Sequence, residues 1–499
     1  MKKVIYSIIT LTLAVVLVTG CNKLKDFGDT NTNTQATTNP ITSALLTNVL
    51  SGIGGWATLT TPALYCQYFS ETQYPDVSCY SANLASPQGN YSGALYDLQN
   101  IINNNTNTVT MATAALNGAN DNQIAIARIL KAYIYWCMTD RWGDIPYTGA
   151  LKGDPNVTFD TQETIYKDLI KEMTEAVAQF TTGAPIVGDI IYGGDVTEWQ
   201  KFANSCRMLM ALRLSNQYPG ASDYSATEFK AALADAAGSI ATNADNFVVN
   251  YTGGNFRNPY YNMYDGRHDF GESETMTTLL SSLSSDNRLS VFGATITGAA
   301  STKGVPYGRS RSAYGSWPGI DSWCGSNSDY AYVFNPTYRQ QTSPAYVMTA
   351  ASVLLARAEA ADRGWTSESA NTTTLYQAGI TASFEQWGLA APSPSYFSNA
   401  SVALSAAPGT GANLQMIATQ EYVAFFPDGW QGWSNWRRTN YPALLPAIDA
   451  TNTPPVIPRR YMYGTQDYAL DNAGVTAAVD RLLPAGNGDK MDSHVWWDK

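Results

Sequence analysis

The chain has 499 residues, of which 44% are hydrophobic and only 14% are charged, and its 30 basic and 41 acidic residues give a net charge of −11. This apolar content excludes a disordered chain, and the acidic balance argues against a nucleic-acid partner. With so few charges, the polar surface must consist largely of Asn, Ser, Thr, Gln and Tyr. Such a surface favours neutral, hydroxyl-rich ligands over ionic ones.

The N-terminus reads as a targeting signal. Two lysines at positions 2 and 3 precede a nearly uninterrupted apolar run over residues 4–18, which has the length of a signal-peptide core and is short for a membrane span. The run ends in the tetrapeptide VTGC, which looks like a bacterial lipobox. We therefore predict a signal peptide over residues 1–20 and a lipid on Cys21, the alternative being an ordinary secretory signal with an incidental cysteine.

A polar stretch rich in Thr and Asn follows over residues 21–40 and is predicted to be a tether. Beyond it, apolar residues three or four positions apart predict helices. These helices are expected around Ile126–Cys137, Ile165–Phe180, Phe202–Leu212 and Phe229–Ile240, and over 344–362, 371–387 and about 412–426. Asp160 and Glu163 have the spacing of a capping box ahead of the helix expected around Ile165–Phe180.

Helix starts near residues 122, 160 and 198 lie about 38 residues apart, close to the 34-residue helix-turn-helix unit of tetratricopeptide arrays. The prediction is a mainly α fold in which tetratricopeptide-like helix pairs form a scaffold, within a single domain over residues 41–499.

The region 241–343 has a different character. It is dense in Gly, Ser, Asn, Tyr and Trp, and only Thr275–Leu283 has a helical pattern. A second loop-like region covers residues 71–91. Long irregular segments inside a compact protein are often functional, so these loops are expected to form the working surface.

Few residues point to catalysis. The two histidines, His268 and His494, are far apart in the sequence, and we find no GxSxG, P-loop or GxGxxG motif. Acidic pairs for glycoside hydrolysis stay possible, because their separation in space is invisible in a sequence. The nearest candidates are Asp140 with Asp144 and Glu421 with Asp428, for which a turn and an ion pair with Arg437 or Arg438 are the simpler interpretations.

After lipidation of Cys21, five cysteines remain without a CxxC pair, so neither a disulfide framework nor a zinc site is indicated. Cys137 and Cys206 lie on apolar helical faces and are expected to be buried. Cys66 and Cys79 could be bridged or free.

Aromatic residues carry the stronger functional signal. A sugar ring can pack its C–H face on an aromatic plane while polar side chains bind its hydroxyls. The alternative is that these rings anchor the loops to the scaffold. The candidate ligand-binding residues are Tyr74, Tyr80, Tyr91, Arg309, Arg311, Tyr314, Trp317, Asp321, Trp323 and Tyr330.

Several motifs then occur in an order that resembles the SusD/RagB family of outer-membrane lipoproteins, in its second subfamily. They are RWGDIPY at 141–147, DNRL at 286–289, LLARAEAA at 354–361, the stretch 420–442 with WRRT, IPRR at 457–460 with Asn472 downstream, and VWWD at 495–498. The second motif has Asn where the family has Pro. Together with the lipobox, the resemblance covers essentially the whole chain.

The resemblance implies four tetratricopeptide-like helix pairs carrying a loop-rich ligand site, without catalytic activity. Members of this family are lipid-anchored at the cell surface and capture oligosaccharides, or in some branches peptides, for a SusC-like TonB-dependent transporter. Their ligand loops correspond to residues 71–91 and 307–332 here. No cofactor or metal is expected, although calcium in some members leaves a structural calcium ion open. An extracellular glycoside hydrolase is the remaining alternative.

Overall fold

The computed structural model describes residues 40–153, 157–284, 286–314, 329–368, 371–405 and 413–499, and residues Thr42–Lys499 form one compact unit. The predicted signal peptide, the lipidation site Cys21 and nearly all of the tether lie outside the described residues. Trp317, Asp321, Trp323 and Cys324 lie outside them too, so their predicted roles stay predictions.

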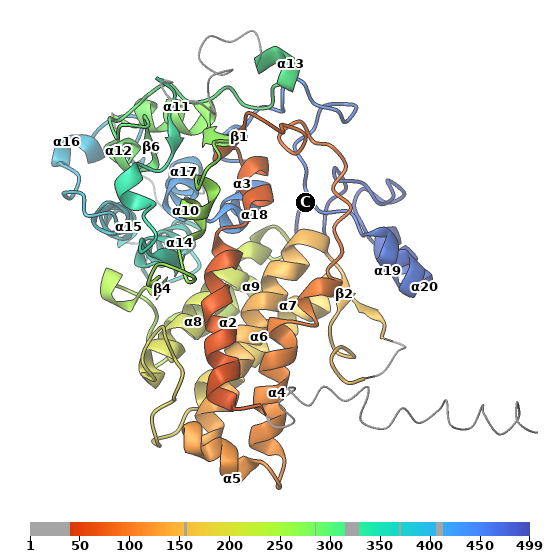
Figure 1. Cartoon of the computed structure of the whole chain (residues 1–499). Coiled ribbons are helices and arrows are strands. Elements are labelled where there is room, and N and C mark those ends of the chain that lie inside the picture. The colour runs from red at the N-terminus through yellow and green to blue at the C-terminus, as the bar shows by residue number, and fades with distance from the viewer. Residues whose placement is uncertain (1–39, 154–156, 285, 315–328, 369–370, 406–412) are drawn as a thin grey trace, which may run out of the picture. The chain divides into compact units, whose positions relative to one another are not determined.

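A row of helices packed side by side builds the lower half of this unit in Figure 1. In order across the row they are α2 (Thr42–Ala57), α4 (Ala94–Thr106), α6 (Asn120–Trp142), α7 (Gln162–Gln179), α8 (Val196–Arg213) and α9 (Tyr224–Leu233). The starts of α6, α7 and α8 lie within two residues of the predicted ones. Their apolar stripes face neighbouring helices, which is why the helical spacing could be read from the sequence.

A second group of helices continues the scaffold. Its members are α3 (Thr60–Tyr65), α14 (Ala350–Asp362), α15 (Thr372–Glu385), α17 (Leu414–Phe425) and α18 (Gly429–Thr439). Consecutive helices pack on each other as α6 with α7, α8 with α9, α14 with α15, and α17 with α18, and α14 also packs on α8. The mainly α fold with tetratricopeptide-like helix pairs is confirmed.

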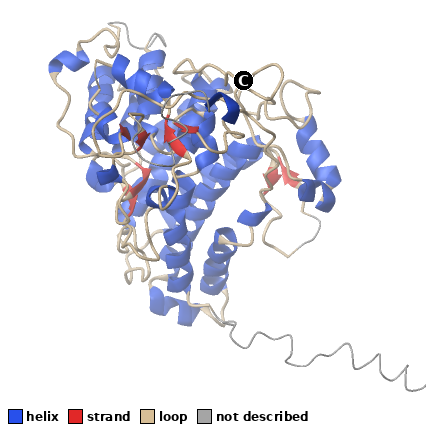
Figure 2. Cartoon of the chain, turned by 45° about the horizontal axis from the view of Figure 1, so that its top comes forward, coloured by secondary structure: helices blue, strands red, loops and turns tan. Residues whose placement is uncertain are grey.

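The remaining described segments are mostly loops with very short elements, as Figure 2 shows by the small share of strand. The strands pair antiparallel as β1 (Phe69–Glu71) with β5 (Phe270–Glu272), β2 (Ile145–Pro146) with β3 (Phe159–Asp160), β4 (Phe247–Val249) with β8 (Ala345–Met348), and β6 (Gly293–Ala294) with β7 (Tyr332–Val333).

Short helices punctuate these loops. They are α5 (Met111–Ala114), α10 (Pro259–Met263), α11 (Glu274–Ser282), α12 (Leu289–Phe292), α13 (Arg311–Tyr314), α16 (Pro394–Phe397), α19 (Thr465–Leu470) and α20 (Asn472–Asp480), with the 3₁₀ turns η2 (Gln88–Asn90), η3 (Ala115–Asn117), η4 (Leu214–Asn216), η5 (Asn243–Asp245) and η7 (Pro336–Tyr338). The expected helix at 275–283 corresponds to α11.

Three local predictions are wrong. One is the helix expected around Phe229–Ile240, because α9 ends at Leu233 and turns follow it. The N-cap of α7 is Thr161, whose hydroxyl accepts a hydrogen bond from the Thr164 amide at 3.3 Å. Asp160 instead accepts the backbone amide hydrogens of Tyr147 and Thr148, and so fixes the loop after α6. The helix expected over 344–362 begins only at Ala350, because β8 occupies Ala345–Met348 and pairs with β4.

The cysteines behave as small hydrophobic residues. Cys66, Cys79, Cys137 and Cys206 are buried and carry free thiols, so Cys66 and Cys79 are not bridged. Burial of Cys137 and Cys206 on the inner faces of α6 and α8 confirms the interpretation of those apolar stripes.

Charged residues of the late motifs lie inside the fold. All eleven residues of α18 are buried. Arg438 binds Glu359 of α14 with Nη2–Oε2 at 2.7 Å, and Glu421 of α17 with Nη2–Oε2 at 3.3 Å. Arg459 forks onto Asp498, and Arg460 pairs with Asp489. These arginines therefore tie the C-terminal region to the scaffold, as their sequence context indicated.

Replacing Arg438 should destabilise the protein strongly. Arg438→Met removes the cation between Glu359 and Glu421, which are both 1% exposed, and leaves buried carboxylates with too little positive charge. We expect a loss of about 3–5 kcal/mol in the free energy of unfolding, measured by urea denaturation.

The control for this variant is Lys171→Met, which removes an exposed ion pair with Glu175 on α7. Exposed pairs contribute little, so no measurable change is expected. Equal unfolding midpoints for the two variants would contradict a stabilising role for the buried network.

Candidate ligand-binding site

The acidic pairs considered for hydrolysis serve the scaffold. Asp140 is buried and accepts hydrogen bonds from Tyr166, from Trp430 Nε1 at 3.0 Å and from Trp497 Nε1 at 3.0 Å. Asp144 pairs with Arg481. These carboxylates are engaged with protein groups, as expected for structural residues.

The second acidic pair also contacts scaffold groups, although Asp428 Oδ2 is buried without a hydrogen-bond partner among the described residues. Glu421 is buried beside Arg438, and Asp428 caps α18 by accepting the Gln431 amide at 3.1 Å. Within the described ranges, no three His, Cys, Asp or Glu side chains gather as metal ligands, and no helix has the length and apolar character needed to cross a membrane.

Three loops that are distant in sequence are joined into one surface. The Ala447 amide donates to the Tyr80 hydroxyl at 2.9 Å, and the Thr451 amide donates to the Cys79 carbonyl at 2.8 Å. The Ser310 amide donates to Asp449 Oδ2 at 2.8 Å. The segments 71–81, 306–314 and 442–451 therefore form a continuous layer, which we call the loop layer.

Gly308 is required where two of these segments meet. Its φ of +62° lies in the left-handed region, and a Cβ on it would stand 2.3 Å from the Cβ of Ala447. Its carbonyl accepts the Asp449 amide at 2.9 Å. Only glycine combines this conformation with so close an approach.

A cleft of about 610 Å³ opens in the loop layer beside α11; we call it the loop cleft. Gln67, another residue with positive φ, lies in its wall. Its Nε2 donates to the Leu445 carbonyl at 2.6 Å and its Oε1 accepts the Thr275 hydroxyl at 2.7 Å. Gln67 thus fixes the 442–451 loop against α11 and sets the width of the cleft.

The rim of the loop cleft is amphipathic. Leu445 and Ile448 are 78% and 71% exposed and lie together on this rim, so they give the cleft a small apolar patch. Arg309 lies on the same cleft, half-buried, with its Nε 3.7 Å from Asp449 Oδ2. Hydroxyl, amide and guanidinium groups therefore stand beside exposed aliphatic groups.

Three predicted ligand-binding tyrosines are instead anchors. Tyr80, Tyr314 and Tyr330 are 1%, 0% and 4% exposed. The Tyr80 hydroxyl holds Ala447, the Tyr314 hydroxyl donates to the Pro306 carbonyl at 2.5 Å, and the Tyr330 ring lies 4.1 Å from Lys303 Nζ. Irregular loops lack a backbone ladder, so buried rings supply their packing.

Other predicted residues occupy different places. Tyr74 is exposed at a loop tip, with the Arg267 guanidinium 5.4 Å from its ring. Arg309 lines the loop cleft, and Arg311 is exposed at the start of α13. Tyr91 lines a separate groove of about 360 Å³ and donates to the Pro146 carbonyl at 2.6 Å.

The 442–451 loop was missed in the sequence. Its apolar residues directly follow the motif stretch 420–442, whose arginines pointed to a structural role. The available signal was the pair of leucines between two prolines at 442–446, since such a loop is rarely exposed without a function.

Comparison with known proteins identifies the family. Residues 31–464 match the family model SusD-like_2, described as starch-binding and associating with the outer membrane. The chain belongs to this SusD-like family. No curated protein matches it.

Solved structures share the fold. A chitin-binding SusD homologue from Flavobacterium johnsoniae has a TM-score of 0.74 at 23% identity, covering 92% of this chain and 98% of its own. A SusD homologue from Bacteroides uniformis has a TM-score of 0.74 at 24% identity, covering 92% and 99%. One from Bacteroides fragilis has a TM-score of 0.70 at 24% identity, covering 92% and 99%.

Glu272, a buried acid on β5, is expected to make the stability of the protein depend on pH. Glu272 of β5 is fully buried, neither carboxylate oxygen has a hydrogen-bond partner among the described residues, and burial raises its pKa well above 4.5. Its backbone carbonyl meanwhile accepts the Val305 amide at 2.8 Å and so holds the loop after β6. A carboxyl group in this setting is favoured in its neutral form.

We expect Glu272→Gln to become progressively more stable than the parent as pH rises. An acid with a raised pKa in the folded state binds its proton more tightly when folded, so the parent loses stability as pH rises from 4.5 through the folded pKa. The gap should be small at pH 5 and grow by up to about 1.4 kcal/mol per pH unit. Thermal unfolding between pH 5 and 9 measures it.

Glu274→Gln, two residues further on and exposed, should not reproduce this trend. If Glu272→Gln were less stable than the parent by the same amount at every pH, a neutral buried Glu272 would be disproved.

Proposed function

We propose that this member of the SusD-like family is a cell-surface lipoprotein, held in the outer membrane by a lipid on Cys21, that captures oligosaccharides and passes them to a SusC-like TonB-dependent transporter. The process consists of binding, handover and release, with no covalent step. The chain is then a binding protein and not an enzyme.

The amphipathic loop cleft is the observation that carries this proposal. Pyranose rings present C–H faces and a belt of hydroxyls, and so need aliphatic or aromatic surface beside fixed donors and acceptors. Leu445 and Ile448 offer the aliphatic surface, and Arg309 and Thr275 offer the hydrogen-bonding groups. The volume of about 610 Å³ is within the usual range for small-ligand sites.

The expected affinity is modest. Hydroxyl groups must give up water to bind, and each resulting hydrogen bond gains only about 0.5–1.5 kcal/mol net. Contact with two aliphatic side chains adds a limited apolar area. Weak binding suits a protein that must release its ligand to a transporter.

The relatives support a carbohydrate ligand. The family description names starch and the outer membrane, and the Flavobacterium homologue is named for chitin binding. Starch and chitin are both neutral polysaccharides, which agrees with the small number of charges in this chain. The alternatives to this proposal are that the protein captures peptides or that it hydrolyses glycosides.

Removing the apolar rim should weaken oligosaccharide binding. In Leu445→Ser/Ile448→Ser the aliphatic surface is lost while Gln67 still fixes the loop through the Leu445 carbonyl. We expect about a tenfold rise in Kd, or about 1.4 kcal/mol, by isothermal titration against maltooligosaccharides and chitooligosaccharides.

The matched control is Leu470→Ser, an equally exposed leucine on α19 at 70% exposure. It should bind like the parent. Binding of oligopeptides alone, or the appearance of shortened chains after incubation with the oligosaccharides, would refute the proposal. A rim variant with parental affinity would place the site elsewhere.

The membrane anchor has a separate test. Cys21→Ser cannot accept a thioether-linked lipid, so the variant should leave the membrane fraction while its thermal unfolding midpoint stays unchanged. Cell fractionation and protease treatment of intact cells measure this. Retention of Cys21→Ser in the membrane, at the parental level, would contradict lipid anchoring at this residue.

A further inference from the structure

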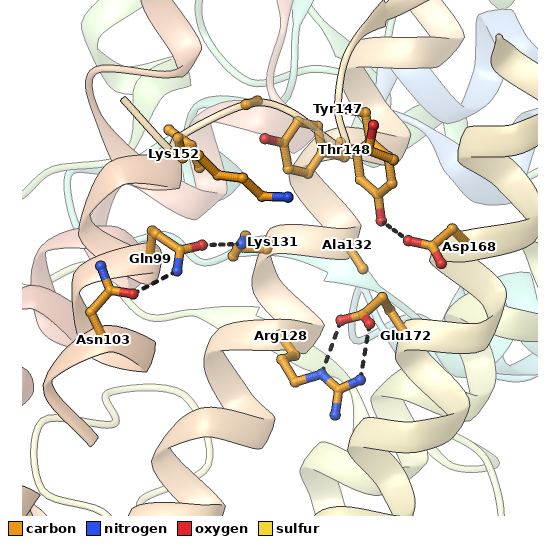
Figure 3. Close-up of a pocket in the computed structure, with 13 residues that line it drawn as sticks. Gln99, Asn103, Arg128, Lys131, Ala132, Tyr147, Thr148, Lys152, Asp168 and Glu172 are labelled. Carbon is orange, nitrogen blue, oxygen red and sulfur yellow. Dashed lines mark hydrogen bonds and ion pairs between the residues drawn. The ribbon is translucent and has the colours of Figure 1, made fainter. Parts of the chain in front are cut away.

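A second cleft of about 650 Å³ lies on the helical scaffold, bounded by α4, α6, α7 and the loop after α6 (Figure 3). We call it the helix cleft. Its lining residues come from three helices and from a loop whose Tyr147 and Thr148 amides are held by Asp160. It shares none of its lining residues with the loop cleft.

Most charges in the helix cleft are already satisfied by the protein. Arg128 forks onto Glu172, with Nε–Oε2 at 2.9 Å and Nη2–Oε1 at 3.0 Å, and also contacts Glu175 at 2.6 Å. Asp168 accepts the Tyr147 hydroxyl at 2.7 Å. Figure 3 shows both interactions along one side of the cleft. These groups form its wall, and the hydroxyl that binds Asp168 supplies a hydrogen bond but no positive charge to balance that carboxylate.

The ammonium groups of Lys131 and Lys152 differ from the charged groups of the wall, because neither is paired with a described carboxylate. Lys131 is half-buried and donates to Gln99 Oε1 at 2.6 Å, which uses one of its three N–H donors. Lys152 is exposed and extends over the same space in Figure 3. Among the described residues, no carboxylate oxygen lies within 4.0 Å of either Nζ.

The two lysines also disfavour each other. Burial lowers the pKa of Lys131, and the positive charges of Arg128 and Lys152 lower it further against the opposing effect of Glu172. A bound anion between the two ammonium groups would relieve this repulsion and use their free donors.

We propose that the helix cleft binds the carboxylate of an acidic sugar between Lys131 and Lys152. Gln99 is engaged through its Oε1 with Lys131 and through its Nε2 with Asn103 Oδ1 at 2.8 Å, so the Asn103 Nδ2 group is the amide that faces the sugar hydroxyls. The Tyr147 ring, packed edge-on against Tyr135 at 4.9 Å, offers an aromatic surface. The cleft of about 650 Å³ is far larger than an inorganic anion, so we infer an anionic group carried on a larger molecule and, following the proposed function, assign that molecule as a saccharide. This inference builds on the proposed function and extends it to charged glycans.

The test compares a galacturonic acid trisaccharide with a galactose trisaccharide by isothermal titration of the full-length protein at low ionic strength, where screening is weak. The acidic trisaccharide should bind at least tenfold more tightly. Lys131→Met/Lys152→Met should lose this preference and keep parental affinity for the neutral trisaccharide. The single variants Lys131→Gln and Lys152→Met should each lose part of the preference for the acidic trisaccharide. They also provide the test if the double variant does not fold.

The control is Lys230→Met, an exposed lysine on α9, which should bind both trisaccharides like the parent. Equal affinities for the two trisaccharides in the parent would overturn the inference, as would an unchanged acidic preference in the double variant. Inorganic phosphate binding as tightly as the acidic trisaccharide would show an anion site without saccharide recognition. The loop-cleft variant Leu445→Ser/Ile448→Ser separates the two proposals, because it should weaken neutral binding and preserve the acidic preference.

Discussion

Buried positive charge on α18 is the constraint on which the rest of the structure depends. Arg437 donates from Nη1 to the carbonyls of Asp140 and Arg459, both at 2.8 Å, with its guanidinium 3.7 Å from the centre of the Trp433 ring. Burial lowers its pKa only to about 10, so it stays charged at neutral pH. Arg438 pairs with Glu359 and Glu421, which come from two further helices. Because a buried charge without partners is very costly, these helices can pack only where the arginines are satisfied.

This constraint also positions the loop cleft. The chain leaves α18 through Asn440, in the left-handed conformation with φ of 59°, and enters the 442–451 loop directly. At the other end of α18, Gly429 and Gly432 leave no room for side chains against α3 and Tyr68, which fixes the start of the 71–81 segment. One buried helix therefore sets the positions of two of the three segments of the loop layer. A cleft built this way loses little conformational freedom when a ligand binds.

The scaffold could be predicted from the sequence because helical periodicity survives wherever one face is buried. Residues 344–348 misled that reasoning, since apolar residues are equally suited to the short strand β8. In the loops, composition pointed to segments that contribute to the loop layer but could not separate exposed from buried rings. Tyr74 and Tyr80 have similar neighbours in sequence, yet one is 60% exposed and the other 1%. The burial of Tyr80 depends on the 442–451 loop, whose Ala447 is 367 residues away along the chain and which no local pattern connects to it.

The low charge content gains a structural meaning from the placement of the ion pairs. Arginines at 288, 438, 459 and 460 pair with acids inside the fold. The loop cleft itself is lined by one basic and one acidic residue, Arg309 and Glu274, which suits a neutral ligand there. The helix cleft is different, because Lys131 and Lys152 face one space and the acids beside them are engaged by Arg128 and Tyr147. Electrostatic attraction of an anion toward this cleft would act over about one Debye length, whereas recognition at the loop cleft requires contact. The two proposed sites would therefore select ligands by different physical means, one by charge and the other by apolar surface beside hydrogen-bonding groups.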